Sequence, residues 1–186
     1  MAFQHKGRKR DRDLVEDRQK VETPPYIITY LRKTYGDEKG YLRDLCPIDY
    51  IKGESVDSLK IDWDSKGKWM FLNPPYKKVL PWFEKAVCDC KKFGTNFIFL
   101  CPFASQTQCS QKVVFKNAHK IHAIEGYVSF VGWDGDEMAT PLCLVEFCYE
   151  SLFVNRNSNC DYIRLYPLKI EGKPKAIKKN KKISVS

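Results

Sequence analysis

A four-residue apolar run that stops at two consecutive prolines constrains the fold of this chain more than any other feature. Residues 69–72 are apolar throughout, and Asn73-Pro74-Pro75-Tyr76 follows them directly. A short run of this kind, bounded by turn residues, is typical of a strand buried on both faces of an α/β sheet. Two prolines remove two backbone donors and fix two φ angles. The pattern therefore predicts a buried strand with a stiff loop at its carboxyl end.

Apolar runs and helical periods alternate along the first two thirds of the chain. The spacing predicts a helix over about 23–36, with Thr23 as its N-cap, and another from Leu80 to Gly94. Alternating strands and helices indicate an α/β sheet, and the last strands indicate antiparallel pairing. Strands are expected at 41–46, 69–72, 96–101, 121–124, 127–131, 142–148 and 162–166, with a further helix at 106–118.

The positive charge of the chain is concentrated at its two ends. The 186 residues carry a formal net charge of +9. Residues 171–186 hold six lysines and one glutamate, and residues 1–20 hold seven basic and four acidic side chains. We therefore expect flexible basic arms at 1–22 and 171–186 around one folded domain at 23–170. Such arms either contact phosphates or only keep the chain in solution, and the sequence leaves both interpretations open.

Composition and cysteine usage point to a soluble protein with reduced thiols. Hydrophobic residues make up 43% and charged residues 30% of the chain, which argues against a disordered or membrane-spanning protein. Because no apolar signal-peptide region follows Met1, we expect an intracellular protein, cytoplasmic in a bacterium or phage and nuclear in a eukaryote or its virus. The only close cysteine pair is Cys88-Asp89-Cys90, which lacks zinc-site spacing, and no metal is expected.

The loop at 73–76 has the chemistry of a site that grips an amine. The Asn73 side-chain oxygen and the Pro74 carbonyl are two acceptors that a stiff loop can aim at one point. Two acceptors suit an exocyclic NH2 group and favour the positive charge that grows on its nitrogen during alkylation. Tyr76 can stack on the ring that carries the amine, and a base inside a duplex would have to be flipped out to reach it. The alternative is a proline turn in which Asn73 caps its own backbone.

Four segments, in order, resemble the N6-adenine DNA methyltransferases, most closely the small phage-type enzymes of the Dam-like family. They are Thr23-Pro24-Pro25 with its helix; residues 42–47; residues 59–63 and 71–76 with the following helix at 81–86; and residues 126–130 with 139–142 and the strand after them. The resemblance covers about 23–150, and Asn-Pro-Pro-Tyr is its specific element. It implies a Rossmann-like S-adenosylmethionine-dependent methyltransferase sheet, mixed with an antiparallel C-terminal hairpin.

The resemblance also implies a role for each matching residue. The catalytic residues would be Asn73, Pro74, Pro75 and Tyr76, which hold the target amine and its ring. The residues that bind S-adenosylmethionine would be Thr23, Pro24, Asp44, Cys46, Asp62 and Trp63, with the last two beside its adenine. DNA is the expected partner, and the residues expected to contact it are Lys77, Lys78, Lys173, Lys175, Lys178 and Lys179. The reaction would be direct transfer of the sulfonium methyl group to nitrogen.

Two other functions fit the same residues. A methyltransferase acting on RNA or on a protein glutamine would use similar chemistry, because release-factor glutamine methyltransferases have the same tetrapeptide. A catalytically silent nucleic-acid-binding module would keep the fold without binding the cofactor. The basic ends favour a nucleic-acid partner, and the intact residues 73–76 favour catalysis.

Overall fold

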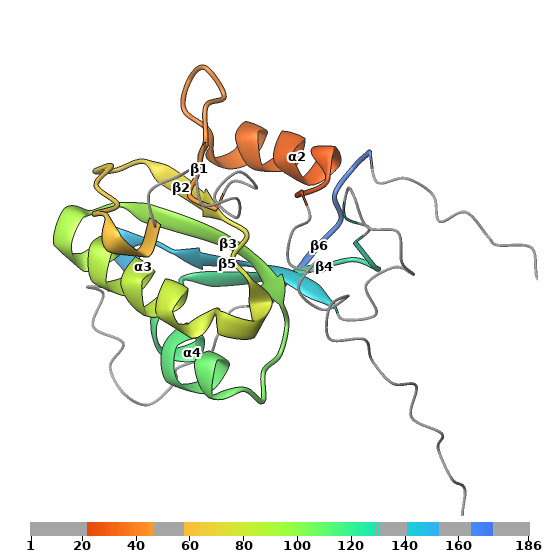
Figure 1. The fold of residues 1–186 in the computed structure, drawn as a ribbon. Helices are drawn as coiled ribbons and strands as arrows, with labels where there is room; N and C mark the ends of the chain where they lie inside the picture. Colours follow the sequence, from red (N-terminus) through yellow and green to blue (C-terminus); the bar gives the residue numbers. More distant parts are fainter. Residues whose placement is uncertain (1–21, 47–57, 129, 131–140, 153–164, 173–186) are drawn as a thin grey trace, which may run out of the picture.

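The structure is a computed structural model that describes residues 22–46, 58–128, 130, 141–152 and 165–172. Its core is one sheet with helices on both faces (Figure 1). The helical elements are α2 (Pro25–Tyr35), η2 (Ser58–Lys60), η3 (Tyr76–Lys78), α3 (Leu80–Phe93), η4 (Ser110–Val114), α4 (Phe115–Asn117) and α5 (Tyr149–Leu152). The strands are β1 (Arg43–Asp44), β2 (Trp69–Leu72), β3 (Asn96–Pro102), β4 (Lys120–Ile124), β5 (Leu142–Phe147) and β6 (Leu165–Leu168).

The six strands form a mixed sheet in the order β1-β2-β3-β5-β4-β6. β1, β2 and β3 pair in parallel, β5 is antiparallel to both β3 and β4, and β6 is parallel to β4. Five strands therefore run in one direction, and β5 alone runs in the other. The predicted α/β class with antiparallel pairing near the C-terminus is confirmed at this level. The carboxyl ends of the five like strands share one edge, which is where open α/β sheets bind ligands.

Side chains of the sheet alternate between two hydrophobic clusters, one on each face. Met70 and Leu72 of β2 pack on the side of α3, whereas Phe71 between them packs on the side of α2. β5 is buried at all six positions because helices cover both faces of the sheet. Figure 1 shows α2 on one face and α3 with α4 on the other. This packing holds β2 rigidly, and with it the loop at 73–76.

Helix α3 follows the local signals that predicted it. Pro81 lies in its first turn, where its missing N–H breaks no helical hydrogen bond. Trp82, Phe83 and Ala86 lie on its buried face. Gly94 ends it with φ of 70°, a left-handed conformation that glycine adopts without strain, and its N–H donates to the Cys90 carbonyl.

Several sequence expectations are corrected by the structure. Thr23 is not the N-cap of α2, because the helix begins at Pro25 and the Thr23 hydroxyl contacts Asn73 instead. The strand expected at 41–46 is only two residues long. No strand forms at the described positions 127, 128 and 130. In the sheet, β3 and β4 occupy both edges of β5, and β6 occupies the other edge of β4.

The last elements differ from expectation in form. The last strand is described over Leu165–Leu168, which includes the end of the expected 162–166, while 162–164 lie outside the described residues. It is parallel to β4, not antiparallel. A helix is present within the expected 106–118, over residues 108–117, but its middle part, η4, is π-helical. Among the described residues, no helix combines the length and hydropathy that a membrane-spanning segment requires.

Candidate active site

The ends of β1 and β2 bring Asp44 and Asn73 to the same edge of the sheet. Asp44 is the last residue of β1 and lies opposite Phe71 of β2, and Asn73 follows the last residue of β2. The Leu45 N–H donates to the Phe71 carbonyl at 3.0 Å, which continues the parallel pairing. The Cys46 thiol accepts a hydrogen bond from the backbone of Asn73. Residues distant in the sequence therefore meet at the carboxyl edge of the sheet.

The Asn73 side chain lies between two hydroxyl groups. Its Nδ2 donates to Thr23 Oγ1 at 3.1 Å, and its Oδ1 accepts from the Tyr76 hydroxyl at 3.0 Å. Thr23 precedes the buried Pro24, the N-cap of α2, so the segment before the helix reaches the loop after β2. The amide is held with its oxygen toward Tyr76, and that oxygen keeps a second lone pair for another donor.

Tyr76 is packed with its hydroxyl inward. Burial raises the pKa of Tyr76 well above its usual value, so the phenol stays neutral and acts as a hydrogen-bond donor to Asn73. Its ring meets the Phe130 ring edge-on, with 6.5 Å between the centroids. Phe130 lies in the connection after β4. Two aromatic rings from distant segments therefore flank the region beside Asn73.

A cavity of about 260 Å³ opens on the α3 side of Tyr76. Its walls come from η3, the first turns of α3, the end of β3 and the η4 segment, and they are mostly apolar. Its volume is close to the lower end of small-molecule sites, roughly 300 Å³. Residues that line it include Tyr76, Lys77, Lys78, Phe83, Phe103 and Cys143.

The Asp44 carboxylate is largely shielded from water. Burial raises its pKa to about 6, and the hydrogen bond that Oδ1 accepts from the Cys46 N–H at 2.8 Å offsets part of this effect. Burial also raises the pKa of the Cys46 thiol, and the nearby Asp44 charge adds to it. In the described part of the chain, no second donor contacts the Asp44 carboxylate. A partly buried carboxylate with an oxygen that no described donor contacts is suited to a ligand that carries hydroxyl or amine donors.

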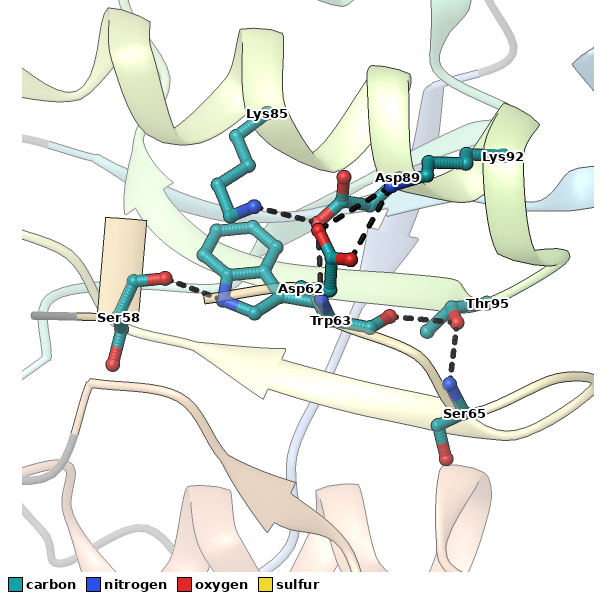
Figure 2. Close-up of polar contacts among 8 residues, drawn as sticks. All are labelled: Ser58, Asp62, Trp63, Ser65, Lys85, Asp89, Lys92 and Thr95. Atoms are coloured by element: carbon teal, nitrogen blue, oxygen red, sulfur yellow. Dashed lines mark hydrogen bonds and ion pairs between the residues drawn. The ribbon is translucent and has the colours of Figure 1, made fainter. Parts of the chain in front are cut away.

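Trp63 is a core residue in this structure, with no exposed surface. Figure 2 shows its contacts: the indole N–H donates to the Ser58 carbonyl at 2.8 Å, and Lys85 Nζ lies over the ring. Trp82 stacks on it with 5.9 Å between centroids. Protein groups of the core therefore cover the ring, and a role for Trp63 beside the cofactor stays a prediction.

Asp62, beside Trp63 in the sequence, lies at the surface. Its side chain is 62% exposed and pairs with Lys92 at 3.3 Å (Figure 2). The neighbouring Asp89 accepts two hydrogen bonds at its Oδ2, one from the backbone N–H of Trp63 at 3.1 Å and one from Lys85 Nζ at 2.8 Å. Among the described residues, no hydrogen bond links Asp62 or Trp63 to Asn73. The structure therefore brings together only part of the predicted cofactor set, namely Thr23, Pro24, Asp44 and Cys46 around the Asn73 loop.

The predicted DNA-contacting lysines fall into two groups. Lys77 and Lys78 are exposed in η3, directly after the loop and at the rim of the cavity. Lys173, Lys175, Lys178 and Lys179 lie outside the described residues. Within the described ranges, no three His, Cys, Asp or Glu side chains are grouped so that they could hold a metal ion.

Two features of the site could not be found from motifs in the chain. Phe130 has no local signal that pairs it with Tyr76, since the contact depends on how the segment after β4 folds back. The Thr23–Asn73 hydrogen bond joins residues that are 50 positions apart. The helix-capping pattern predicted instead that Thr23 contacts the first turn of its own helix.

Comparison with known proteins adds one match. The family model described as DNA N-6-adenine-methyltransferase (Dam) matches residues 10–141. This span is more than half of the chain and includes both Asp44 and the Asn-Pro-Pro-Tyr loop. No curated protein and no solved structure matches the chain.

Proposed function

Because this chain belongs to the DNA N-6-adenine-methyltransferase (Dam) family, we propose that it moves a methyl group from S-adenosylmethionine to the N6 amine of an adenine flipped out of DNA. The observation that carries this proposal is the position of Asn73, which follows β2 at the carboxyl edge of the sheet, beside the partly buried Asp44 and in contact with Tyr76. The inserted antiparallel strand β5 in an otherwise parallel sheet is consistent with a Rossmann-like methyltransferase core.

Asn73 and Pro74 hold the target amine in this proposal. The second lone pair of Asn73 Oδ1 and the Pro74 carbonyl accept the two N6 hydrogens, which turns the nitrogen lone pair outward. Both acceptors belong to a loop that two prolines and a buried strand keep rigid. They therefore stabilise positive charge on the nitrogen without first having to reorganise. Pro75 contributes by fixing the backbone that joins Pro74 to Tyr76.

The cofactor is assigned to the group of residues on the other side of Asn73. Asp44 fits a donor-bearing ligand, because its carboxylate lies partly buried at the sheet edge and, among the described residues, accepts one hydrogen bond, from the Cys46 N–H. Thr23, Pro24 and Cys46 complete this group through their contacts and positions around Asn73. When bound, S-adenosylmethionine supplies the electrophilic methyl carbon. The protein supplies alignment of that carbon with the amine, which is a large part of the rate enhancement in such transfers.

Tyr76, with Phe130 beside it, provides the surface for the flipped base. A ring stacked on an aromatic side chain gains roughly 1–3 kcal/mol, which offsets part of the cost of unstacking it from the duplex. Lys77 and Lys78 follow Tyr76 directly and are exposed, so they are placed to contact the phosphates next to the flipped nucleotide. The basic arms at 1–22 and 171–186 add phosphate contacts around the domain at 23–170.

Identifying the methylated product tests this function. The full chain is incubated with S-adenosylmethionine labelled in its methyl group and, in parallel, with DNA, RNA or a protein mixture, and each product is digested. We expect label in N6-methyladenine from DNA. Label in an RNA base or in a protein glutamine would replace the proposed substrate. If S-adenosylmethionine does not bind to the chain and no substrate is methylated, the result would support a catalytically silent nucleic-acid-binding module.

A further inference from the structure

A second cleft, of about 400 Å³, opens at the amino ends of β1 and β2. It therefore lies at the opposite edge of the sheet from Asn73. Its walls are the turn after α2, Arg43 of β1 and the turn that leads into Trp69 of β2. None of the residues proposed for methyl transfer lines this cleft.

The turn after α2 presents an aromatic ring at the mouth of this cleft. Tyr41 is 66% exposed, although its backbone is firmly held. The Asp37 N–H donates to the Tyr41 carbonyl at 3.0 Å, and Asp37 Oδ1 accepts from the N–H groups of Lys39 and Tyr41 at 3.0 and 2.9 Å. Gly40 completes the turn with φ of 71°. The ring is thus displayed by a pre-formed turn, which reduces the entropy that a ligand stacked on it would cost.

Two cationic side chains line the same cleft as this ring. Arg43 and Lys68 are exposed and line the cleft, and among the described residues neither forms an ion pair. Of the described residues that line it, Asp37 is the only acidic one, and its Oδ1 already accepts two backbone hydrogen bonds. The inner wall is the half-buried Trp69, which packs against Tyr35 with 4.9 Å between ring centroids. The cleft therefore combines aromatic surface with unpaired positive charge.

We propose that this cleft binds a single-stranded segment of nucleic acid. A base stacks on Tyr41, and the phosphates beside it contact Arg43 and Lys68. A single strand is favoured over a duplex because the face of Tyr41 can stack only on an unpaired base, whereas a duplex presents phosphates and groove edges. The inference goes beyond the proposed methyl transfer, because it concerns the opposite edge of the sheet and needs neither cofactor nor adenine.

An oligonucleotide of eight thymidines, dT8, tests the cleft without engaging an adenine site. Its affinity for the full chain is measured by fluorescence anisotropy as a function of salt concentration. We expect Tyr41→Ala to weaken binding about 10-fold and Tyr41→Phe to preserve it, because stacking needs only the ring. We expect the double variant Arg43→Gln/Lys68→Gln to lower the slope of log affinity against log salt by about 1.4, which is two phosphate contacts on a single strand.

Matched controls separate this cleft from general charge and from the Asn73 loop. Lys91→Gln/Lys112→Gln removes the same charge elsewhere on the surface and should leave dT8 affinity within about 2-fold. Asn73→Ala should leave it unchanged, because thymine has no exocyclic amine. The proposal is overturned if Tyr41→Ala binds dT8 as tightly as the unaltered chain, if Asn73→Ala causes the loss instead, or if an eight-base-pair duplex competes as well as dT8. These outcomes are independent of whether the chain methylates DNA.

Discussion

The orientation of the Asn73 side chain depends on two neighbouring hydroxyl groups, those of Thr23 and Tyr76. The sequence predicted a different contact for Thr23, as the N-cap of its helix. If the Thr23 hydroxyl is removed, Nδ2 of Asn73 loses the acceptor at 3.1 Å and the half-buried amide is no longer tethered on that side. We expect Thr23→Val to lower the rate of methyl transfer about 10-fold, because a hydrogen bond of this kind contributes about 0.5–1.5 kcal/mol. Steady-state kinetics with S-adenosylmethionine and DNA measure this change.

Thr23→Ser is the matched control for that variant, because it keeps the hydroxyl and loses only a methyl group. It should retain most of the activity. A loss that appears in the KM for S-adenosylmethionine with kcat unchanged would show that Thr23 acts on the cofactor and not on Asn73.

Asp44 gives the site a dependence on pH. Because burial raises its pKa to about 6, the carboxylate gains charge as the pH rises from 5 to 7, and affinity for a donor-bearing cofactor should rise over this interval. In Asp44→Asn, equilibrium binding of S-adenosylmethionine should be weaker at pH 7 and nearly independent of pH. Equal affinity in both proteins at pH 7 would remove Asp44 from the cofactor site.

The same pKa shift acts on stability in the opposite direction. A carboxyl whose pKa is higher in the folded chain than its usual 3.8 binds its proton more tightly there, so its contribution to stability falls as the pH rises from 3.8 to about 6. We expect Asp44→Asn to be at least as stable as the unaltered chain at pH 8. Asp44 would thus lower the stability of the fold while contributing to cofactor binding.

Single residues show where interpretation from the sequence stops. Asn73 could be placed at the end of a strand because its signals are local: an apolar run before it and two prolines after it. The burial of Trp63 could not be predicted, since an aromatic residue beside an acidic one looks the same in a core as in a ligand site. Only the stacking on Trp82 and the Ser58 hydrogen bond show that its ring is covered.

Helix α2 is tied to the sheet at both of its ends. Near its start, Thr23 bonds to Asn73, and at its last residue the Tyr35 hydroxyl donates to Glu146 Oε1 of β5 at 2.6 Å. His122 of β4 also lies 2.6 Å from this oxygen. The buried Glu146 thus joins one helix and two strands, and it helps to set the position of the helix that carries Thr23 to the site.

Removing the Tyr35 hydroxyl should loosen this connection. Tyr35→Phe leaves a buried carboxylate with one donor fewer, and we expect a loss of about 1.5–3 kcal/mol in the free energy of unfolding. Thermal denaturation should show a decrease of about 2–4 °C in Tm for each kcal/mol lost. Tyr30→Phe removes a hydroxyl from the same helix, has no such partner among the described residues, and should have little effect. Equal Tm shifts in the two variants would contradict the role of Glu146.

Because Glu146 stabilises the fold in its charged form, we expect the stability of the protein to fall when Glu146 is protonated in acid. Burial alone would raise its pKa, but the hydrogen bonds from His122 and Tyr35 outweigh burial and hold the pKa below its usual 4.5. A lowered carboxyl pKa contributes stability that is present above pH 4.5 and is lost as the pH falls below it. Denaturant unfolding at pH 7 and pH 3.5 should therefore show a smaller loss of stability on acidification in Glu146→Gln than in the unaltered chain.

The elements that the sequence predicted well are those with local signals. Helix α3 has a proline in its first turn and a glycine at its end, and both bounds agree with expectation. The failures are pairing problems: the described positions 127, 128 and 130 join no strand, and the direction of β6 depends on its partner β4. Pairing of this kind is decided by residues far apart in the sequence, which no window along the chain contains.

At the scale of the whole molecule, positive charge is concentrated at the two ends of the sequence. The six lysines at 173–182 should add phosphate contacts outside the folded domain. Replacing all six with glutamine keeps the length of the chain, and we expect weaker DNA binding and a smaller salt dependence. The slope of log affinity against log salt should fall by up to roughly 5 if each lysine neutralises one phosphate of duplex DNA. Identical affinity at low salt would show that this segment contacts no phosphate.

The central claim is that the loop between β2 and η3 holds an adenine amine for methylation, and Asn73→Ala tests it most directly. With enzyme in excess over adenine-containing DNA and with saturating S-adenosylmethionine, the first-order rate of N6-methyladenine formation is measured for this variant and for the unaltered chain. We predict a fall of at least about 100-fold, the usual effect of removing one group that stabilises transition-state charge, with Tm changed by only a few degrees. A rate within a few-fold of the unaltered chain, in a variant that is folded to the same extent, would contradict the account.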